Sequence, residues 1–268
     1  MVVLEKARCN MKESEKIRRK IRDGEFVGQT SGVAPGYAQA NLVVLPKKYA
    51  FDFLLFIQRN PKPCPLLEVT DVGSPYTKQV ADNADLRTDI PKYRVYEKGK
   101  LVDEPIDITS YWNDDLVAFL LGCSFSFEWA LLEAGIPVRH IEANRNVPMY
   151  ITNIQTNPAG VFHGPLVVSM RSIPYDLVVK ATNITARFPS VHGAPVHIGY
   201  PELIGIYNLN KPDYGDPPII KENDIPVFWA CGVTPQAVAV NSKIDFMITH
   251  SPGHMFVTDL KNQDFALF

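Results

Sequence analysis

The chain has 268 residues, of which 46% are hydrophobic and 21% charged, and its formal net charge is −2. These values are those of an ordinary globular protein, large enough for one large domain or for two lobes. They exclude the strong positive charge expected of a protein that binds nucleic acid or an anionic membrane.

Cysteine usage and the apolar segments predict a cytoplasmic protein. Four cysteines are widely spaced and form no C-x-x-C pair: Cys9, Cys64, Cys123 and Cys231. This spacing argues against a zinc ribbon or a disulfide framework and fits a reducing compartment. The N-terminal apolar run is too short for a signal peptide. Because Glu128 and Glu133 interrupt the apolar stretch 116–138, we expect a buried helix there and no membrane span.

The N-terminal part predicts a charged helix followed by a glycine-rich loop. Residues 5–23 carry both signs of charge, which is typical of a solvated helix face. Gly28, Gly32 and Gly36 then recur every four residues, in a loop whose backbone N–H groups could meet an anion. The loop matches neither common phosphate-binding motif. The apolar pattern further predicts a strand at 41–46, a helix at 48–59, a strand at 66–70 and a hairpin at 93–102.

A helix N-terminus near Ser124 is the first candidate for a binding site. We expect helices over 111–121 and from Ser124 to Glu133, with Ser124 as the N-cap and Glu128 in the first turn. Free backbone N–H groups at such an end suit a carboxylate or a phosphate. They would also lower the pKa of the Cys123 thiol.

Arginine and histidine side chains gather around a predicted β-α-β unit further along the chain. Its predicted elements are strands at 138–141, 147–154 and 164–171 and a helix at 176–186. Arg171 ends a strand, and Arg187, His192 and His197 lie in a loop that Pro189 and Pro195 keep from being helical. A plain polar turn, with both histidines bonded to backbone carbonyls, is the alternative.

The C-terminal part predicts a second β-α-β unit. Apolar runs at 226–230 and 245–249 flank a short helix at 235–242, which is typical of buried parallel strands. Cys231 and His250 directly follow these strands, as Asp71 follows the strand at 66–70. Since ligands bind at the carboxyl ends of parallel strands, we expect these three residues to meet at one edge.

Five motifs in order resemble those of the D-glutamate cyclase family, also described as hydro-lyases. They are G-C-S-F-S-F-E (122–128), P-A-G-V-F-H-G-P-L-V-V-S-M-R (158–171), T-A-R-F-P-S-V-H-G-A-P-V-H-I-G (185–199), P-V-F-W-A-C-G-V-T-P-Q (226–236) and T-H-S-P-G-H-M (249–255). The resemblance runs from about residue 24 to residue 259. It implies an α/β protein: a three-layer α/β/α lobe with a mainly parallel sheet, formed by residues 1–154 and 216–268, and a smaller inserted two-layer α+β lobe at 155–215.

The resemblance implies a carbon–oxygen lyase that converts D-glutamate to 5-oxo-D-proline and water. Such a reaction needs a grip on the substrate carboxylates, acid–base groups and donors for an oxyanion. We expect Arg187, or else Arg171, to bind the carboxylates, and His192 and His250 to transfer protons. Glu128 would orient a histidine or the substrate ammonium. Cys123 or Cys231 would act as a nucleophile in a covalent variant of the mechanism.

Further residues complete the predicted site. Backbone N–H groups around Cys123 and Ser124, or at Gly232, would hold the oxyanion, and His197 and Asn153 would contact the substrate. We expect a small-molecule carboxylate as the substrate, no cofactor and no metal, and we leave a homo-oligomer open. Two alternatives remain: a metal-dependent lyase or hydrolase with His192 and His197 as ligands, and a non-catalytic protein that binds amino or hydroxy acids.

Overall fold

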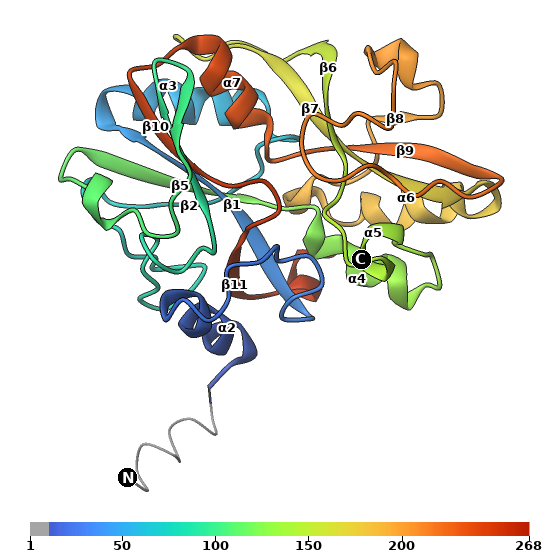
Figure 1. Ribbon diagram of the computed structural model, residues 1–268, viewed down its shortest axis with the longest axis horizontal. Helices are drawn as coiled ribbons and strands as arrows, with labels where there is room; N and C mark the ends of the chain where they lie inside the picture. Colours follow the sequence, from blue (N-terminus) through green and yellow to red (C-terminus); the bar gives the residue numbers. More distant parts are fainter. Residues whose placement is uncertain (1–10, 268) are drawn as a thin grey trace, which may run out of the picture.

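The computed structural model describes residues 11–267, in which helices and strands are mixed and form two sheets (Figure 1). Cys9 and the start of the predicted helix at 5–23 lie outside the described residues. The larger sheet is formed by seven strands: β1 (Tyr37–Pro46), β2 (Leu66–Val69), β3 (Tyr93–Glu97), β4 (Lys100–Asp103), β5 (Leu116–Gly122), β10 (Phe246–His250) and β11 (Phe256–Lys261). Their order is β2-β5-β1-β10-β3-β4, and β11 also pairs with β1.

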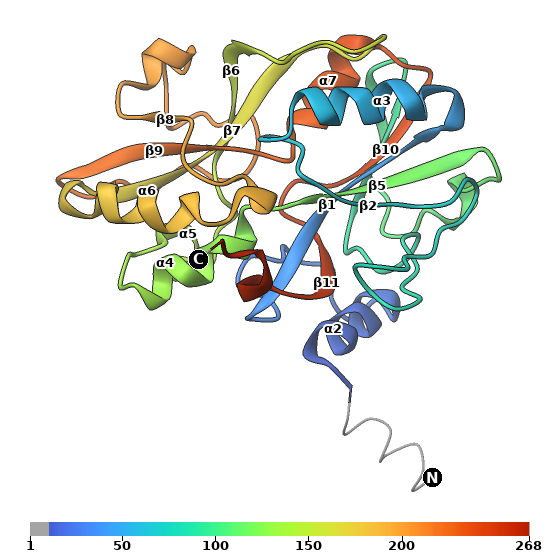
Figure 2. The ribbon, with the colours of Figure 1, turned by 180° about the vertical axis from the view of Figure 1, so that it is seen from behind.

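The smaller sheet has the strand order β6-β7-β9-β8 and lies beside the larger one (Figures 1 and 2). Its strands are β6 (Met149–Gln155), β7 (Pro165–Pro174), β8 (His197–Ile198) and β9 (Asp224–Ala230). The α-helices are α2 (Glu13–Arg22), α3 (Lys47–Arg59), α4 (Phe125–Glu133), α5 (Arg139–Glu142), α6 (Val178–Ala186) and α7 (Thr234–Ser242). Short 3₁₀ helices are η1 (Thr109–Tyr111), η2 (Tyr175–Leu177), η3 (Pro189–Val191), η4 (Pro201–Ile204) and η5 (Asn262–Phe265).

Strand β1 separates two apolar cores because its side chains alternate between the faces of the sheet. Leu42 and Val44 pack on one face, while Val43 and Leu45 face α3 and α7 on the other. A third core joins α4 and α6 to the smaller sheet around the fully buried Trp229. Both sheets are thus covered by helices, and the α/β class predicted from the sequence is confirmed.

The predicted parallel sheet is wrong, because every strand pair within residues 11–267 is antiparallel. Strands β9 and β10 do not form a β-α-β unit, since they belong to different sheets. The expected meeting of Asp71, His250 and Cys231 fails for the same reason. Strands β2 and β10 run in opposite directions, so their carboxyl ends lie at opposite edges of the larger sheet, and Cys231 follows a strand of the other sheet.

Two predicted elements have the wrong type. Residues 116–122 form strand β5, paired on both sides by β1 and β2, where a helix was expected over 111–121. A continuous apolar run does not distinguish a doubly paired central strand from a buried helix. Residues 139–142 form the short helix α5 in place of a strand. The lobe boundaries at 155 and 215 stay a prediction, although the smaller sheet takes strands from both sides of them.

Within residues 11–267, no helix combines the length and the apolar character needed to cross a bilayer.

Candidate active site

A buried ion pair between Glu128 of α4 and Arg171 of β7 is the centre of the candidate site. Both residues are 2% exposed. Arg171 Nε donates to Glu128 Oε1 at 3.2 Å, and Arg171 Nη2 donates to the same oxygen. Burial alone would raise the pKa of Glu128, but the neighbouring His140 and Arg171 lower it below the ordinary value. Glu128 is therefore an anion in the interior of the protein.

Most hydrogen-bond donors of the Arg171 guanidinium are bonded to other groups of the protein. Its Nη1 donates to Ser169 Oγ at 2.6 Å, and its Nη2 donates to Ser124 Oγ at 3.0 Å. The aromatic rings of Phe127 and Trp229 lie 5.4 and 5.5 Å from its central carbon. Ser124 thus holds the arginine and does not cap α4 with its side chain, contrary to the sequence-based expectation. Arg171 fixes Glu128 in place and has little capacity left for a substrate carboxylate.

Strand β5 ends at Gly122, just before Ser124 and Glu128, and only glycine fits at this position. A Cβ atom on Gly122 would lie 2.2 Å from the carbonyl oxygen of Ser190, which belongs to η3. The same crowding appears at the end of β9, where a Cβ atom on Gly232 would lie 1.9 Å from Asn41 Nδ2. The end of β5 therefore packs closely against η3, and the segment after β9 packs closely against β1 of the larger sheet.

His140 is a neighbour of Glu128 that sequence reasoning missed. Its Nε2 lies 3.1 Å from Glu128 Oε1, although the two atoms lack the alignment of a hydrogen bond. The residue lies on α5, which was predicted as a strand. If R-H-I-E (139–142) is interpreted as a helical turn, His140 is expected to face the core, and this contact could have been predicted.

The second oxygen of Glu128, Oε2, is buried and has no hydrogen-bond partner within the described residues. Glu128 lines a cavity of about 190 Å³, together with the glycine-rich loop 32–37 and residues of α4 and α5. Three more buried atoms without partners belong to residues that line the same cavity: Gln39 Oε1, Asn262 Oδ1 and Trp129 Nε1. Unsatisfied buried polar atoms are costly, and in native proteins they mark places where water or a ligand completes the bonding.

The glycine-rich loop 32–37 thus forms one side of this cavity. Gly32 and Gly36 have φ values of +73° and +84°, which L side chains rarely adopt. Gln39 Nε2 donates to the carbonyls of Thr30 and Val33 and holds the loop against β1. The glycine spacing predicts a place for an anion, but of the four unpartnered buried atoms of residues that line this cavity, three are acceptors: Glu128 Oε2, Gln39 Oε1 and Asn262 Oδ1.

The two predicted acid–base histidines are buried and neutral, and they lie in different surroundings. His192 Nδ1 contacts the carbonyl oxygen of Lys62 at 2.8 Å, and burial lowers the pKa of His192 to about 4. Its Nε2 has no partner among the described residues, and Arg171 is one of the charges that act on it. His250 Nδ1 contacts the backbone of Leu42, and burial lowers the pKa of His250 to about 3.

Cys123 and Cys231 pack in one apolar cluster with Val147, Met149 and Met255. Burial raises the pKa of the Cys123 thiol far above its usual range and that of Cys231 to about 11. The predicted lowering of the Cys123 pKa by the helix N-terminus is therefore wrong, because desolvation outweighs the favourable N–H groups. Both thiols remain protonated near neutral pH.

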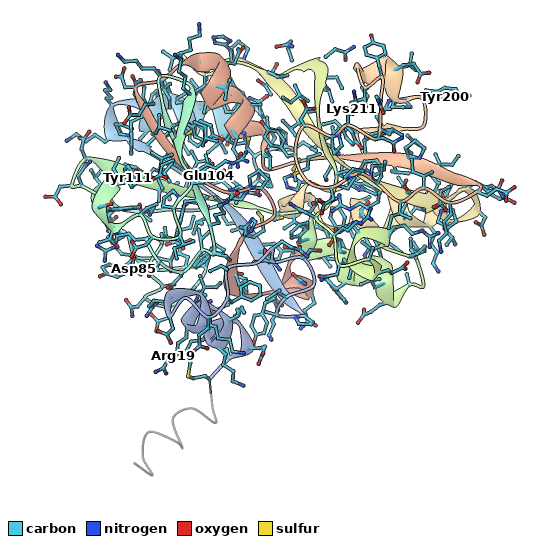
Figure 3. All side chains as sticks on the ribbon, in the orientation of Figure 1. Arg19, Asp85, Glu104, Tyr111, Tyr200 and Lys211 are labelled. Carbon is cyan, nitrogen blue, oxygen red and sulfur yellow. The ribbon has the colours of Figure 1, made fainter. Side chains whose placement is uncertain are left out.

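Three predicted substrate-binding residues lie outside this cluster. Arg187 is exposed at the end of α6. Asn153 is exposed on the edge strand β6 and donates to the carbonyl of Leu203 at 3.4 Å. His197 Nε2 contacts the carbonyl of Tyr200, which lies at the outer edge of the molecule in Figure 3. The structure brings together Glu128, Arg171, Ser124, Cys123, Cys231 and His192. Among residues 11–267, no three His, Cys, Asp or Glu side chains are arranged to hold a metal ion.

Comparison with known proteins gives the family. The sequence profile described as D-glutamate cyclase matches residues 117–259. A protein of Thermoanaerobacter sp. (strain X514) is 68% identical over 96% of this chain and 97% of its own length. The chain belongs to the D-glutamate cyclase family. Relatives from Psychrobacter arcticus and Geobacillus kaustophilus are 60% and 62% identical over 97% and 95% of this chain, and over 98% and 97% of their own lengths.

All three relatives carry the name "Putative hydro-lyase". The predicted family is therefore confirmed. The prediction of an enzyme of the carbon–oxygen lyase class is confirmed as well. A solved structure of a nitrogen repressor-like protein from Methanococcus jannaschii has a TM-score of 0.38 and 11% identity, over 94% of this chain and 100% of its own. A likeness this weak supports no conclusion.

Proposed function

We propose that the protein cyclises D-glutamate to 5-oxo-D-proline and water, with Glu128 as the group that binds the substrate ammonium and moves its protons. One observation carries this proposal: Glu128, a residue that borders the cavity, is a buried anion whose Oε1 is held by Arg171 while its buried Oε2 has no hydrogen-bond partner within the described residues. Gln39 and Asn262 border the same cavity, and each has a buried side-chain oxygen without a partner within the described residues. An ammonium group has three N–H donors and would satisfy all three oxygens.

In this proposal, one carboxylate carries out all the proton transfers of the reaction. The nitrogen forms a bond to the side-chain carboxyl carbon, and one carboxyl oxygen leaves as water. Two protons leave the ammonium nitrogen, which becomes the lactam N–H, and both end on the departing oxygen. Glu128 Oε2 would accept each proton from nitrogen and return it to that oxygen, acting in turn as general base and general acid. Trp129 borders the cavity, its buried Nε1 is a donor without a partner within residues 11–267, and in this proposal that N–H stabilises the oxyanion.

The remaining predicted residues keep narrower roles in this proposal. Arg171 and Ser124 position Glu128, since their polar atoms bond to each other and to Glu128 Oε1. A covalent step through Cys123 or Cys231 is disfavoured because both thiols are protonated. His192 is a second candidate for proton transfer, because its buried Nε2 is free and near Arg171. Activity of a folded His192→Gln variant would remove it from the mechanism.

The test is incubation of the purified protein with D-glutamate, L-glutamate and 5-oxo-D-proline, followed by chiral chromatography with and without a chelator. We expect conversion in the D-series only, unaffected by the chelator. Absence of D-glutamate conversion would refute the proposed substrate, and loss of conversion with the chelator would favour the metal-dependent alternative. Thermal stabilisation by D-glutamate without any turnover would favour the non-catalytic binding protein. The cytoplasmic location stays a prediction.

A further inference from the structure

A narrow cleft is lined by residues of α5, of β7 and of the segment 217–219. Its volume is about 10 Å³, which is space for about one particle of the size of a water molecule. Within the described part of the chain no Asp or Glu lines the cleft, and its polar lining residues are Arg139, His140, Arg145, Arg171 and Ser172. The other lining residues are apolar. The cleft therefore combines apolar walls with side chains that donate hydrogen bonds.

Three of these polar residues are buried and have incomplete hydrogen bonding. Arg171, Ser172 and His140 are 2%, 3% and 6% exposed. A second N–H on Nη1 of Arg171 remains, because this nitrogen donates once within the described residues, to Ser169 Oγ. Ser172 Oγ donates to the sulfur of Met170 at 3.8 Å, and a thioether is a weak acceptor. His140 Nε2 has no hydrogen-bond partner within residues 11–267. A bound acceptor would complete this bonding.

Arg145 supplies a positive charge that has no counter-ion in the described part of the chain. It is exposed, lines the cleft and forms no ion pair with any acidic group of residues 11–267. Its backbone N–H donates to the carbonyl oxygen of His140 at 2.8 Å, which holds it against α5. Arg139 differs, because its Nη2 lies 3.3 Å from the buried carboxylate of Asp224. An anion in the cleft would balance the charge of Arg145.

We infer that this cleft binds a monatomic anion such as chloride. The charge of Arg145 and the donors of Arg171 and Ser172 favour an anion, since a buried charge must be paired and hydrogen-bonded. The small volume and the apolar walls favour a single atom over a sulfate or phosphate group. The inference is independent of the proposed function, because no step of the cyclisation uses this anion.

Chloride titration in a methanesulfonate buffer of constant ionic strength tests the inference. The chloride NMR line should broaden saturably with wild-type protein at concentrations up to about 0.15 M, and Tm should rise as the site fills. Bromide should displace chloride, whereas sulfate at the same ionic strength should not. In Arg145→Met, loss of a charge-assisted contact should raise the chloride Kd about tenfold, and Arg145→Lys should retain most of the affinity. Ser172→Ala should also raise this Kd.

Arg187→Met is the matched control, since Arg187 is also exposed and without an ion pair in the described residues but does not line the cleft. Its chloride Kd should equal that of wild type. Absence of saturable broadening, or equal Kd values in Arg145→Met and wild type, would overturn the inference. Equal weakening in Arg187→Met, or displacement by sulfate as well as by bromide, would indicate general attraction to the surface and would also overturn it.

Discussion

Replacing Glu128 with glutamine tests both the ion pair and the proposed chemistry. The change keeps the shape of the side chain and removes the charge, so Arg171 remains 2% exposed with no counter-ion. Breaking a buried pair in this way costs on the order of 3 kcal/mol of unfolding free energy or more. For a chain of this size, that corresponds to a fall in Tm of roughly 6–12 °C. Removal of a general acid–base group should lower kcat at least about 100-fold.

A second variant separates loss of stability from loss of chemistry. In Glu128→Gln with Arg171→Met both charges are absent, and neutral replacement of a buried pair is often close to neutral for stability. We expect the double variant to regain most of the lost Tm and none of the lost kcat. Differential scanning calorimetry and the chiral assay measure the two quantities on the same preparations. Recovery of activity together with stability, or a folded Glu128→Gln protein with more than about a tenth of wild-type kcat, would refute Glu128 as the proton-transfer group.

Three further predictions concern the surroundings of the ion pair. The pKa values of His192 and His250 are lowered to about 4 and about 3, so below pH 6.5 the unfolded chain binds protons that the folded chain does not. The free energy of unfolding should therefore decrease as the pH is lowered below 6.5, and His192 should account for ~3 kcal/mol of this decrease. In His192→Gln, the free energy of unfolding measured with urea should decrease less over the same pH range. Because burial raises the pKa of Cys231 to about 11, its thiol should resist iodoacetamide at pH 8 until the protein unfolds, as peptide mass spectrometry would detect. Gly232→Ala should lower the unfolding free energy by about 1–3 kcal/mol, because its Cβ would lie 1.9 Å from Asn41 Nδ2; an unchanged denaturant midpoint would contradict this packing.

Local patterns in the sequence predicted most elements but not their pairing. The helix at 48–59 and the strands at 66–70 and 226–230 appear within a few residues of α3, β2 and β9. The direction of pairing was inferred from apolar runs alone, which report burial on both faces and not strand direction. The C-terminal strands were therefore placed in one parallel sheet, whereas β9 and β10 belong to two antiparallel sheets.

The candidate site was predictable where motif residues share a buried environment. Glu128, Arg171 and Ser124 were named from motifs and meet in the structure. The unpartnered buried atoms of Gln39, Asn262 and Trp129 were not predicted. Each has a side chain common in ordinary cores and caps, and only the three-dimensional structure reveals that its polar atom lacks a partner. These three residues are distinguished by a polar atom that lacks a hydrogen bond, and not by their residue types.

The position of β10 between β1 and β3 has a consequence for biosynthesis. Strand β1 is synthesised well before its partners β10 and β11, which include residues 246–250 and 256–261. Among the described strands, the hairpin of β3 and β4 joins the larger sheet only through β10. A nascent chain that has passed residue 103 therefore carries this hairpin without its edge partner until residues 246–250 have been synthesised. Because unpaired strand edges promote association, chaperones, or a delay in the synthesis of residues 246–250, should affect the yield of native protein.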